Sequence, residues 1–197
     1  NELSGTSPVD SGASLRADAW TLSESAVAGY TPGAWVCLGG RQTANQVTLS
    51  VGEEATCTVT NDDIAPKLHL RKVVVNDNGG TKTAADFTLT ADGAGSNDLS
   101  GTSPVDSGAA LTADTWTLSE TAVAGYAASA WSCVGGTQDG NRITVGLAGE
   151  ATCTITNDDV APRLHLRKVV VNDSGGTKTV ADFTLTGRAM RNVRQMV

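Results

Sequence analysis

The chain has 197 residues, of which 40% are hydrophobic, 4% aromatic and 18% charged, and its formal net charge is −7. This length allows one or two small domains. The acidic balance argues against nucleic-acid binding, which needs clustered Lys and Arg, and no apolar run approaches the roughly 20 residues of a membrane-spanning helix. The N-terminus lacks the basic and apolar regions of a signal peptide. We therefore expect a soluble acidic protein or a fragment of one, without membrane insertion.

The chain repeats itself with a period of 96 residues. The segment that begins LSGTSPVDSGA at Leu3 recurs from Leu99, and the segment that begins at Cys57 recurs from Cys153. A unit of this size is a domain and not a solenoid repeat of 20–50 residues.

Ala-Pro steps mark the boundaries between the units. The chain starts and stops between such boundaries, so the repeat is cut out of phase. Residues 67–160 make one complete unit. Residues 1–64 hold the back of a second unit, and residues 163–186 hold its front. An isolated half would leave strand edges open, so we expect the halves to combine, as a circularly permuted domain or by strand exchange between chains. Residues 187–197 leave the repeat; an adapted helix is one interpretation, and we favour an out-of-frame or cloning-boundary segment.

Each unit has the pattern of β-structure. In the complete copy, alternating residues over 68–75 predict a first strand, followed by an Asn- and Gly-rich turn over 76–80. Five further short strands are predicted around FTLT, WTLSE, AWSC, ITV and CTIT, which contain Phe87, Trp116, Trp131, Ile143 and Cys153. Six or seven strands at this spacing indicate an all-β protein of tandem antiparallel sandwiches with an immunoglobulin-like layout.

Three polar residues of the complete unit share a face with apolar neighbours. Lys72 lies in the apolar stripe of the first strand, Glu120 ends that of WTLSE, and Asn157 ends that of CTIT. A lone buried charge costs several kcal/mol, so such groups are paired or neutral. The other copy repeats them as Lys168, Glu24 and Asn61.

A lysine, a glutamate and an asparagine on neighbouring inner faces can react with one another. Burial disfavours the charged forms of amines and carboxyl groups. A neutral amine is a nucleophile, the carboxamide is an acyl electrophile, and a protonated carboxyl polarises the carbonyl and moves protons. The product is a Lys–Asn isopeptide bond, formed with loss of ammonia. The alternative is that the side chains lie at strand ends and extend to water.

The run LHLRKVVVNDNGG, then WTLSETAVAGY, then CTITND resembles the prealbumin-like repeats of bacterial surface proteins, relatives of the collagen-adhesin B-type and pilin domains. The likeness covers residues 1–186. In that family a first-strand lysine bonds to a last-strand asparagine, assisted by a glutamate that follows an aromatic residue, here tryptophan in place of tyrosine. The matching residues are Lys72, Asn157 and Glu120 in one unit and Lys168, Asn61 and Glu24 in the other.

The resemblance implies a secreted, non-enzymatic stalk or adhesin module at the bacterial cell surface. Its partners would be neighbouring repeats or a second copy, and its external ligand stays open. The alternative is a small ester or lactone hydrolase, with or without a metal, motivated by the odd ends and by His, Asp and Asn groupings. No GxSxG elbow or phosphate-binding loop occurs. A carbohydrate- or protein-binding module ranks lower, because the tryptophans lie on predicted core faces.

The four cysteines form one pair in each unit, Cys37/Cys57 and Cys133/Cys153. No CxxC motif occurs and the histidines lie far from any cysteine, so we expect no zinc site. The pairing predicts disulfides and an oxidising compartment, and reduced buried thiols are the alternative.

Two Asn/Asp-rich segments, residues 61–63 and 76–78, offer oxygen ligands for Ca²⁺. Neither matches a full calcium loop, so we expect ordinary turns and no cofactor. His69 and His165 occupy equivalent outward positions on a strand and are expected to be solvated.

Overall fold

A computed structural model of the chain describes residues 2–12, 15–95 and 97–189. Strands make up most of the regular structure, and the 3₁₀ helices in these ranges are η1 (Ala84–Asp86) and η2 (Val180–Asp182). Neither is long or apolar enough to cross a membrane, nor is any other helix in the described residues. The chain divides into two compact units after Asp159.

Residues 67–159, the central module, contain ten strands in their described part, arranged in two five-stranded sheets. One sheet has the order β10 (Leu99–Gly101), β9 (Leu89–Asp92), β12 (Asp114–Glu120), β16 (Arg142–Val145) and β15 (Thr137–Asp139). The other has the order β11 (Val105–Asp106), β8 (Lys67–Val75), β17 (Glu150–Asp159) and β13 (Tyr126–Ala128), and β14 (Ser132–Val134) also pairs with β17. The predicted β-sandwich is confirmed.

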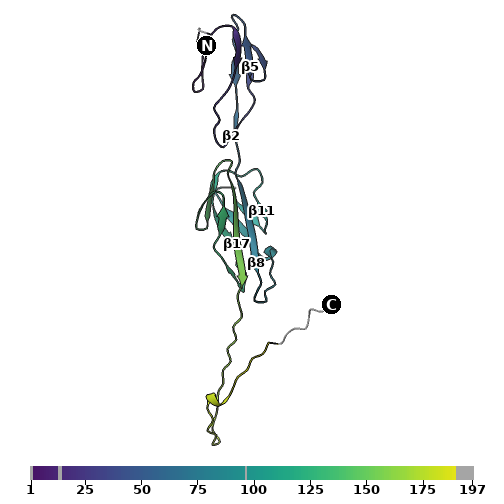
Figure 1. Ribbon diagram of the computed structural model, residues 1–197, viewed down its shortest axis with the longest axis vertical. Helices are drawn as coiled ribbons and strands as arrows, with labels where there is room; N and C mark the ends of the chain where they lie inside the picture. Colours follow the sequence, from purple (N-terminus) through teal and green to yellow (C-terminus); the bar gives the residue numbers. More distant parts are fainter. Residues whose placement is uncertain (1, 13–14, 96, 190–197) are drawn as a thin grey trace, which may run out of the picture. The chain divides into compact units, whose positions relative to one another are not determined.

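The first and last strands of the central module, β8 and β17, are neighbours in one sheet and run parallel (Figure 1). Their register extends from Lys67 opposite Glu150 to Val75 opposite Asp158. The other described pairs are antiparallel, as expected from the sequence. At about 3.3 Å per residue, the parallel register is on the order of 30 Å long. The chain therefore joins the module at one end of these strands and leaves it at the other.

The core of the central module lies between the two sheets. Leu68 and Leu70 of β8 are fully buried, as are Trp116 of β12 and Ile143 of β16. The Trp116 indole nitrogen donates a hydrogen bond of 2.8 Å to the Asn97 carbonyl, which satisfies its buried polar atom. The alternation of the strands thus predicted the inner faces correctly.

Residues 1–64, the half module, repeat the pairings of β12 to β17. Trp20 is opposite Val47, as Trp116 is opposite Ile143. The sheets are β1-β5-β4, β2-β7 and β3-β6. Their strands are β1 (Asp18–Thr21), β2 (Tyr30–Pro32), β3 (Val36–Leu38), β4 (Arg41–Thr43), β5 (Gln46–Leu49), β6 (Thr56–Thr58) and β7 (Asn61–Asp63). The predicted turn over residues 61–63 is wrong, because these residues pair with β2.

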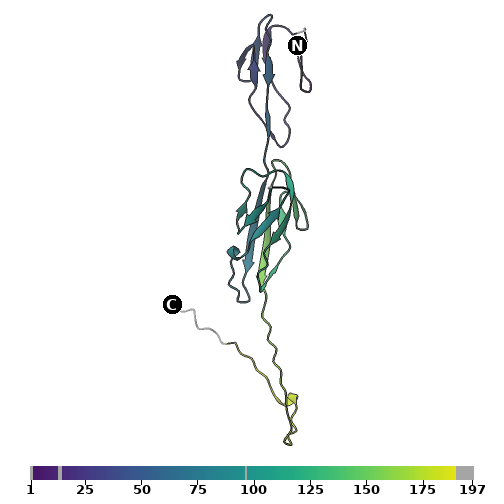
Figure 2. The ribbon, with the colours of Figure 1, turned by 180° about the vertical axis from the view of Figure 1, so that it is seen from behind.

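Residues 160–189, the C-terminal segment, repeat the sequence of β8 and η1 but contain no strand in their described part (Figure 2). Leu164 is 76% exposed and Phe183 42%, whereas their counterparts Leu68 and Phe87 are fully buried. The combination of residues 1–64 with 163–186 stays a prediction. Residues 187–189 have no regular structure, and the rest of the predicted divergent tail lies outside the described residues.

Candidate cross-linking site

Lys72 and Glu120 meet in the interior of the central module. Lys72 comes from β8 and Glu120 from the end of β12, so their contact joins the two sheets. The Lys72 Nζ lies 2.5 Å from the Glu120 Oε2, and the exposed fractions of the two side chains are 0% and 8%. The Lys72 Nζ also lies 4.3 Å from the centroid of the Phe87 ring. The amine therefore has a carboxyl group as a hydrogen-bonding partner and an aromatic ring that covers it.

Asn157 lies on the same buried face of the parallel pair as Lys72. Lys72 is opposite Ile155, and Asn157 follows Ile155 by two positions, so its side chain points to the same side. Asn157 is 2% exposed, and its Oδ1 is buried with no hydrogen-bond partner in the described part of the chain. A buried carbonyl oxygen without a donor is costly, so this atom is poised to accept one.

In the second copy, the counterparts fall into two pairs. The Asn61 Nδ2 donates a hydrogen bond of 3.2 Å to the Glu24 Oε2 in the half module. The Lys168 Nζ lies 4.6 Å from the Phe183 ring centroid in the C-terminal segment. The lysine–phenylalanine contact of the central module is thus repeated in the segment that carries Lys168.

Both predicted disulfides are present. Cys37–Cys57 joins β3 to β6, and Cys133–Cys153 joins β14 to β17. The alternative of reduced thiols is therefore wrong for this structure.

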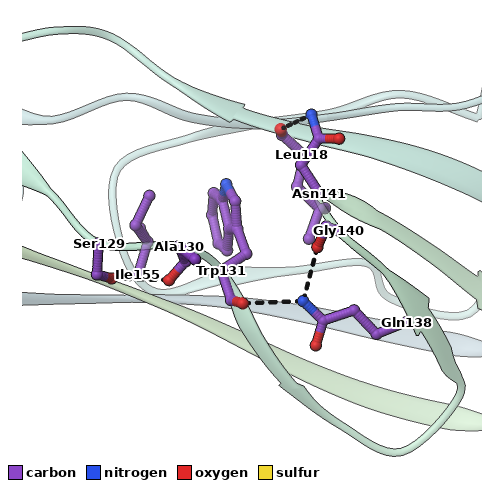
Figure 3. Close-up of a pocket in the computed structure, with 8 residues that line it drawn as sticks. All are labelled: Leu118, Ser129, Ala130, Trp131, Gln138, Gly140, Asn141 and Ile155. Atoms are coloured by element: carbon purple, nitrogen blue, oxygen red, sulfur yellow. Dashed lines mark hydrogen bonds between the residues drawn. The ribbon is translucent and has the colours of Figure 1, made fainter.

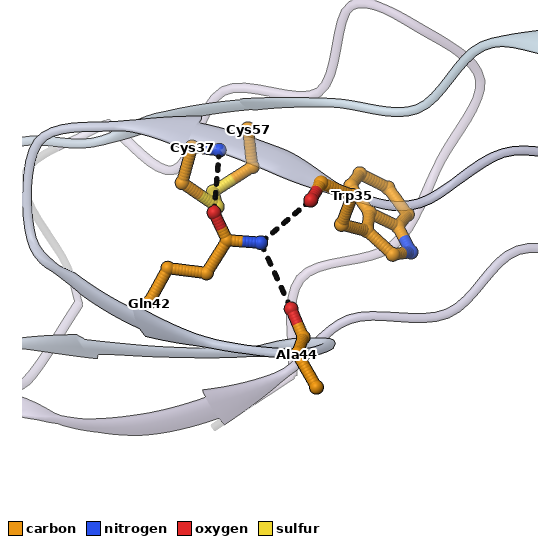
Figure 4. Close-up of a disulfide and its surroundings, with 5 residues drawn as sticks. All are labelled: Trp35, Cys37, Gln42, Ala44 and Cys57. Atoms are coloured by element: carbon orange, nitrogen blue, oxygen red, sulfur yellow. Dashed lines mark hydrogen bonds between the residues drawn. A yellow bond between two sulfur atoms is a disulfide. The ribbon is translucent and has the colours of Figure 1, made fainter.

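A glutamine holds the strands beside each disulfide, and sequence reasoning missed it. The Gln42 Oε1 accepts a hydrogen bond from the Cys37 amide at 2.9 Å (Figure 4). Its Nε2 donates to the carbonyls of Trp35 at 2.6 Å and Ala44 at 2.8 Å. Gln138 repeats all three contacts beside Cys133. The available signal was a glutamine five residues after the first cysteine in both copies.

The central module has a pocket of about 640 Å³ lined by Leu118, Trp131 and Ile155 among others, and none of Lys72, Glu120 and Asn157 lines it (Figure 3). Its amide side chains are used in the fold itself. Asn141 donates to the Leu118 carbonyl at 3.2 Å, and Gln138 donates to the Trp131 carbonyl at 2.8 Å. These two hydrogen bonds are made to backbone carbonyls of the protein, so they stabilise the fold and give no evidence for a bound ligand.

Asp77, Asp158 and Asp159 are the described acidic residues that lie closely enough to hold a cation, with ligand atoms within 4.8 Å of one another. Asp158 raises the pKa of Asp77 by charge repulsion. Burial raises the pKa of Asp159, but hydrogen bonds from the Asn78 and Gly80 amides outweigh it and leave that pKa below its usual value. The Asp159 carboxylate therefore accepts hydrogen bonds from the backbone of the turn after β8. The expectation of an ordinary turn there, without a bound cation, stays a prediction.

His69 is less solvated than expected, with a side chain 19% exposed. Its Nδ1 lies 2.5 Å from an Asp106 oxygen and its Nε2 lies 3.3 Å from Glu150. Arg71 also contacts Asp106, at 2.7 Å. The hydrogen bond with His69, and then that from Arg71, lower the pKa of Asp106. The expected solvated state is wrong for His69, whereas His165 is exposed.

A family model described as a prealbumin-like fold domain matches residues 2–59, 63–155 and 159–196. Among solved structures, the major pilin protein T-13 of Streptococcus pyogenes is similar, with a TM-score of 0.34 and 11% sequence identity. That alignment covers 72% of this chain and 66% of the pilin, so the chain spans less than two thirds of that protein. No curated protein matches the chain.

Proposed function

Because the chain belongs to the family of prealbumin-like fold domains, we propose that it is a structural spacer of a bacterial surface protein and that an isopeptide bond joins Lys72 to Asn157. One observation carries the cross-link: a fully buried lysine contacts Glu120 at 2.5 Å, on the face where the Asn157 oxygen lacks a partner. A buried amine next to a carboxyl group and a carboxamide has the groups that acyl transfer requires.

The reaction exchanges one amide for another. A bond forms between the Lys72 Nζ and the Asn157 Cγ, and the bond from Cγ to Nδ2 breaks. Glu120 takes a proton from the amine and returns one to the leaving nitrogen, which departs as ammonia. In its protonated form, Glu120 also donates to the Asn157 Oδ1 and polarises the carbonyl. The carboxyl group is regenerated, so no oxidant or further reactant is consumed.

The disulfides support the location that this function needs. Cys37–Cys57 and Cys133–Cys153 each close a loop over a sequence separation of 20 residues. Such bonds persist outside the reducing cytosol, and small domains with few aromatic residues benefit from the constraint. We place the module in an extracellular surface protein, where neighbouring repeats of the same family are its structural partners.

Intact-mass spectrometry of the reduced, denatured chain tests the cross-link. Acyl transfer removes ammonia, so the mass should fall about 17 Da below the sequence mass for the bond of the central module. Lys72→Arg, Asn157→Ala and Glu120→Gln should each abolish this loss, and a digest should yield a branched peptide that contains Lys72 and Asn157. An unshifted mass of the wild-type chain would refute the bond and leave the fold unaffected.

The hydrolase alternative has a separate test. It was motivated by groupings that include His165, whose side chain is exposed in the C-terminal segment. Turnover of a chromogenic ester or a lactone that disappears in the His165→Ala variant would overturn the assignment as a non-enzymatic spacer. We expect no turnover from the wild-type chain or from the His165→Ala variant.

A further inference from the structure

The turn that follows β8 is held by the end of β17. Asp159 is the last residue of β17 and is 6% exposed. Its Oδ1 accepts a hydrogen bond from the Asn78 amide at 2.9 Å, and its Oδ2 accepts one from the Gly80 amide. The Asn78 Nδ2 donates to the Asp159 carbonyl at 3.0 Å. The side chain and the backbone of one strand end therefore both bind the turn that follows the neighbouring strand.

Tyr126 of β13 connects the same turn to the lysine. Its hydroxyl donates a hydrogen bond to the Asn76 Oδ1 and accepts one from the Lys82 amide at 3.0 Å. Its ring meets the Phe87 ring edge-on, with 5.8 Å between the centroids and an angle of 81° between the planes. The Phe87 ring in turn lies against the Lys72 Nζ. A continuous series of contacts therefore runs from the turn to the amine.

Gly80 lies at the centre of these contacts. A Cβ atom at this position would overlap the Tyr126 hydroxyl. It would also lie 2.7 Å from the Asp159 Oδ2 and 2.8 Å from the Asn76 Oδ1, which is closer than a Cβ contact allows. The three polar groups therefore close around a position with room for glycine and for no larger residue.

The contact of Asp159 with the turn also fixes the register of β17 against β8. In this register Lys72 lies opposite Ile155 and Asn157 lies two positions further along β17. A slip of one residue would turn the Asn157 side chain to the outer face of the sheet. Each residue of slip would also carry the Asp159 carboxylate about 3.3 Å along the strand, out of reach of the turn amides. The hydrogen bonds of Asp159 therefore select the register that places the carboxamide near the amine.

We propose that Asp159 and Tyr126 are positioning residues of the cross-linking reaction. Asp159 holds β17 in the register that brings Asn157 to the lysine, and Tyr126 holds the ring of Phe87 against its amine. This role rests on the bond proposed between Lys72 and Asn157. Reacting groups must meet in a narrow range of distance and angle, and a displacement of about 1 Å can cost about 100-fold in rate. The loss of either positioning residue should therefore slow the reaction in a chain that still folds.

The rate of cross-linking in the full chain tests this proposal. The wild-type chain and its variants are synthesised in vitro in an oxidising buffer, sampled at intervals into denaturant, reduced and digested. The fraction of the branched peptide that contains Lys72 and Asn157 gives the rate. Urea unfolding of each variant in the Asn157→Ala background shows separately that the chain is native before urea is added, so that a slower reaction cannot be assigned to unfolded chain.

Two variants and one control make the comparison. Tyr126→Phe keeps the ring beside Phe87 and removes both hydrogen bonds of the hydroxyl, and Asp159→Asn replaces one accepting oxygen with an amide donor. Each should slow formation of the branched peptide about 10- to 100-fold. Gln138→Ala is the matched control, because it removes three hydrogen bonds elsewhere in the central module and should keep the wild-type rate.

The outcomes separate this proposal from the proposed function. If the wild-type chain forms the branched peptide and both variants form it at the wild-type rate, the positioning role is overturned and the cross-link stands. If the wild-type chain forms none, the cross-link itself is overturned and the positioning role with it. A Gln138→Ala chain slowed as strongly as the variants would also overturn the positioning role, because the rate would then follow general stability. Should Asp159→Asn fail to fold, Tyr126→Phe decides, since it removes a single oxygen atom.

Discussion

The buried contact between Lys72 and Glu120 predicts that each residue contributes more to the free energy of unfolding when the other is present. We consider this in an Asn157→Ala background, where Lys72 has no carboxamide to react with. In this background, Lys72→Met leaves the Glu120 carboxyl buried without its partner, and Glu120→Leu leaves the amine buried without its own. The double variant removes both polar groups and leaves two apolar side chains between the sheets.

The magnitude follows from the burial of the pair. With exposed side-chain fractions of 0% and 8% and a contact of 2.5 Å, neither group has water to replace a lost partner. Loss of one partner of a buried pair lowers the free energy of unfolding by about 3–5 kcal/mol, whereas apolar replacement of both is often neutral or stabilising. We therefore expect two strongly destabilised single variants and a double variant that recovers most of the loss.

Urea unfolding of the full chain, followed by tryptophan fluorescence, to which the buried Trp116 contributes, measures this cycle. With an m-value of about 1–3 kcal/mol per M, each single substitution should lower the midpoint by at least about 1 M. A single variant whose free energy of unfolding lies within about 1 kcal/mol of its background would refute the reasoning, since solvent-exposed ion pairs contribute no more than that. A double variant as unstable as the sum of the singles would refute it as well.

Three further predictions concern the disulfide, its glutamine and the acid limit of stability. Cys133→Ala should lower the free energy of unfolding by about 3 kcal/mol, the value expected for a loop of this length, and this difference from the wild-type chain should disappear when both chains are reduced. Gln138→Ala removes three hydrogen bonds around that disulfide, so it should cost about 1–3 kcal/mol in the same assay. Hydrogen bonds with His69 and Arg71 hold the pKa of Asp106 below its usual value, so the contribution of Asp106 to stability is complete above the unfolded-state pKa and is lost as the pH falls through the folded-state pKa. Asp106→Asn should therefore be less stable than the wild-type chain at neutral pH, and the difference should vanish in acid; a difference that grows in acid would contradict the assignment.

The inner faces of the sandwich could be predicted from the sequence because they depend on local alternation. β8 is nine residues long, so its period is unmistakable and places Lys72 on the buried side. The same rule placed Glu120 and Asn157 at the ends of apolar stripes. Strands such as β11, two residues long, carry too little pattern to be found in this way. Alternation also gives the face of a residue and not its neighbour, so it did not show that β8 and β17 run parallel.

Contacts between distant strands escaped prediction for the same reason. His69 looks like an outward residue on its own strand, and only the neighbouring β11 and β17 bring Asp106 and Glu150 to its two nitrogens. The Asp77 turn was visible in the sequence, whereas its approach to Asp159 depends on how β8 and β17 end together. Such long-range pairings follow from topology, which the sequence of one strand does not contain.

The parallel pairing of β8 and β17 has a mechanical consequence. A pull on the two connections of the central module acts at Lys67 and at Asp159, the opposite ends of adjacent strands. This loads the pair in shear, so its hydrogen bonds must yield together and not one after another, as they would if the strands were peeled apart. With the proposed amide bond in place, tension would pass from Lys72 directly to Asn157. The other strands of the sandwich would then bear no tension, and their role would be to keep water away from the amide bond.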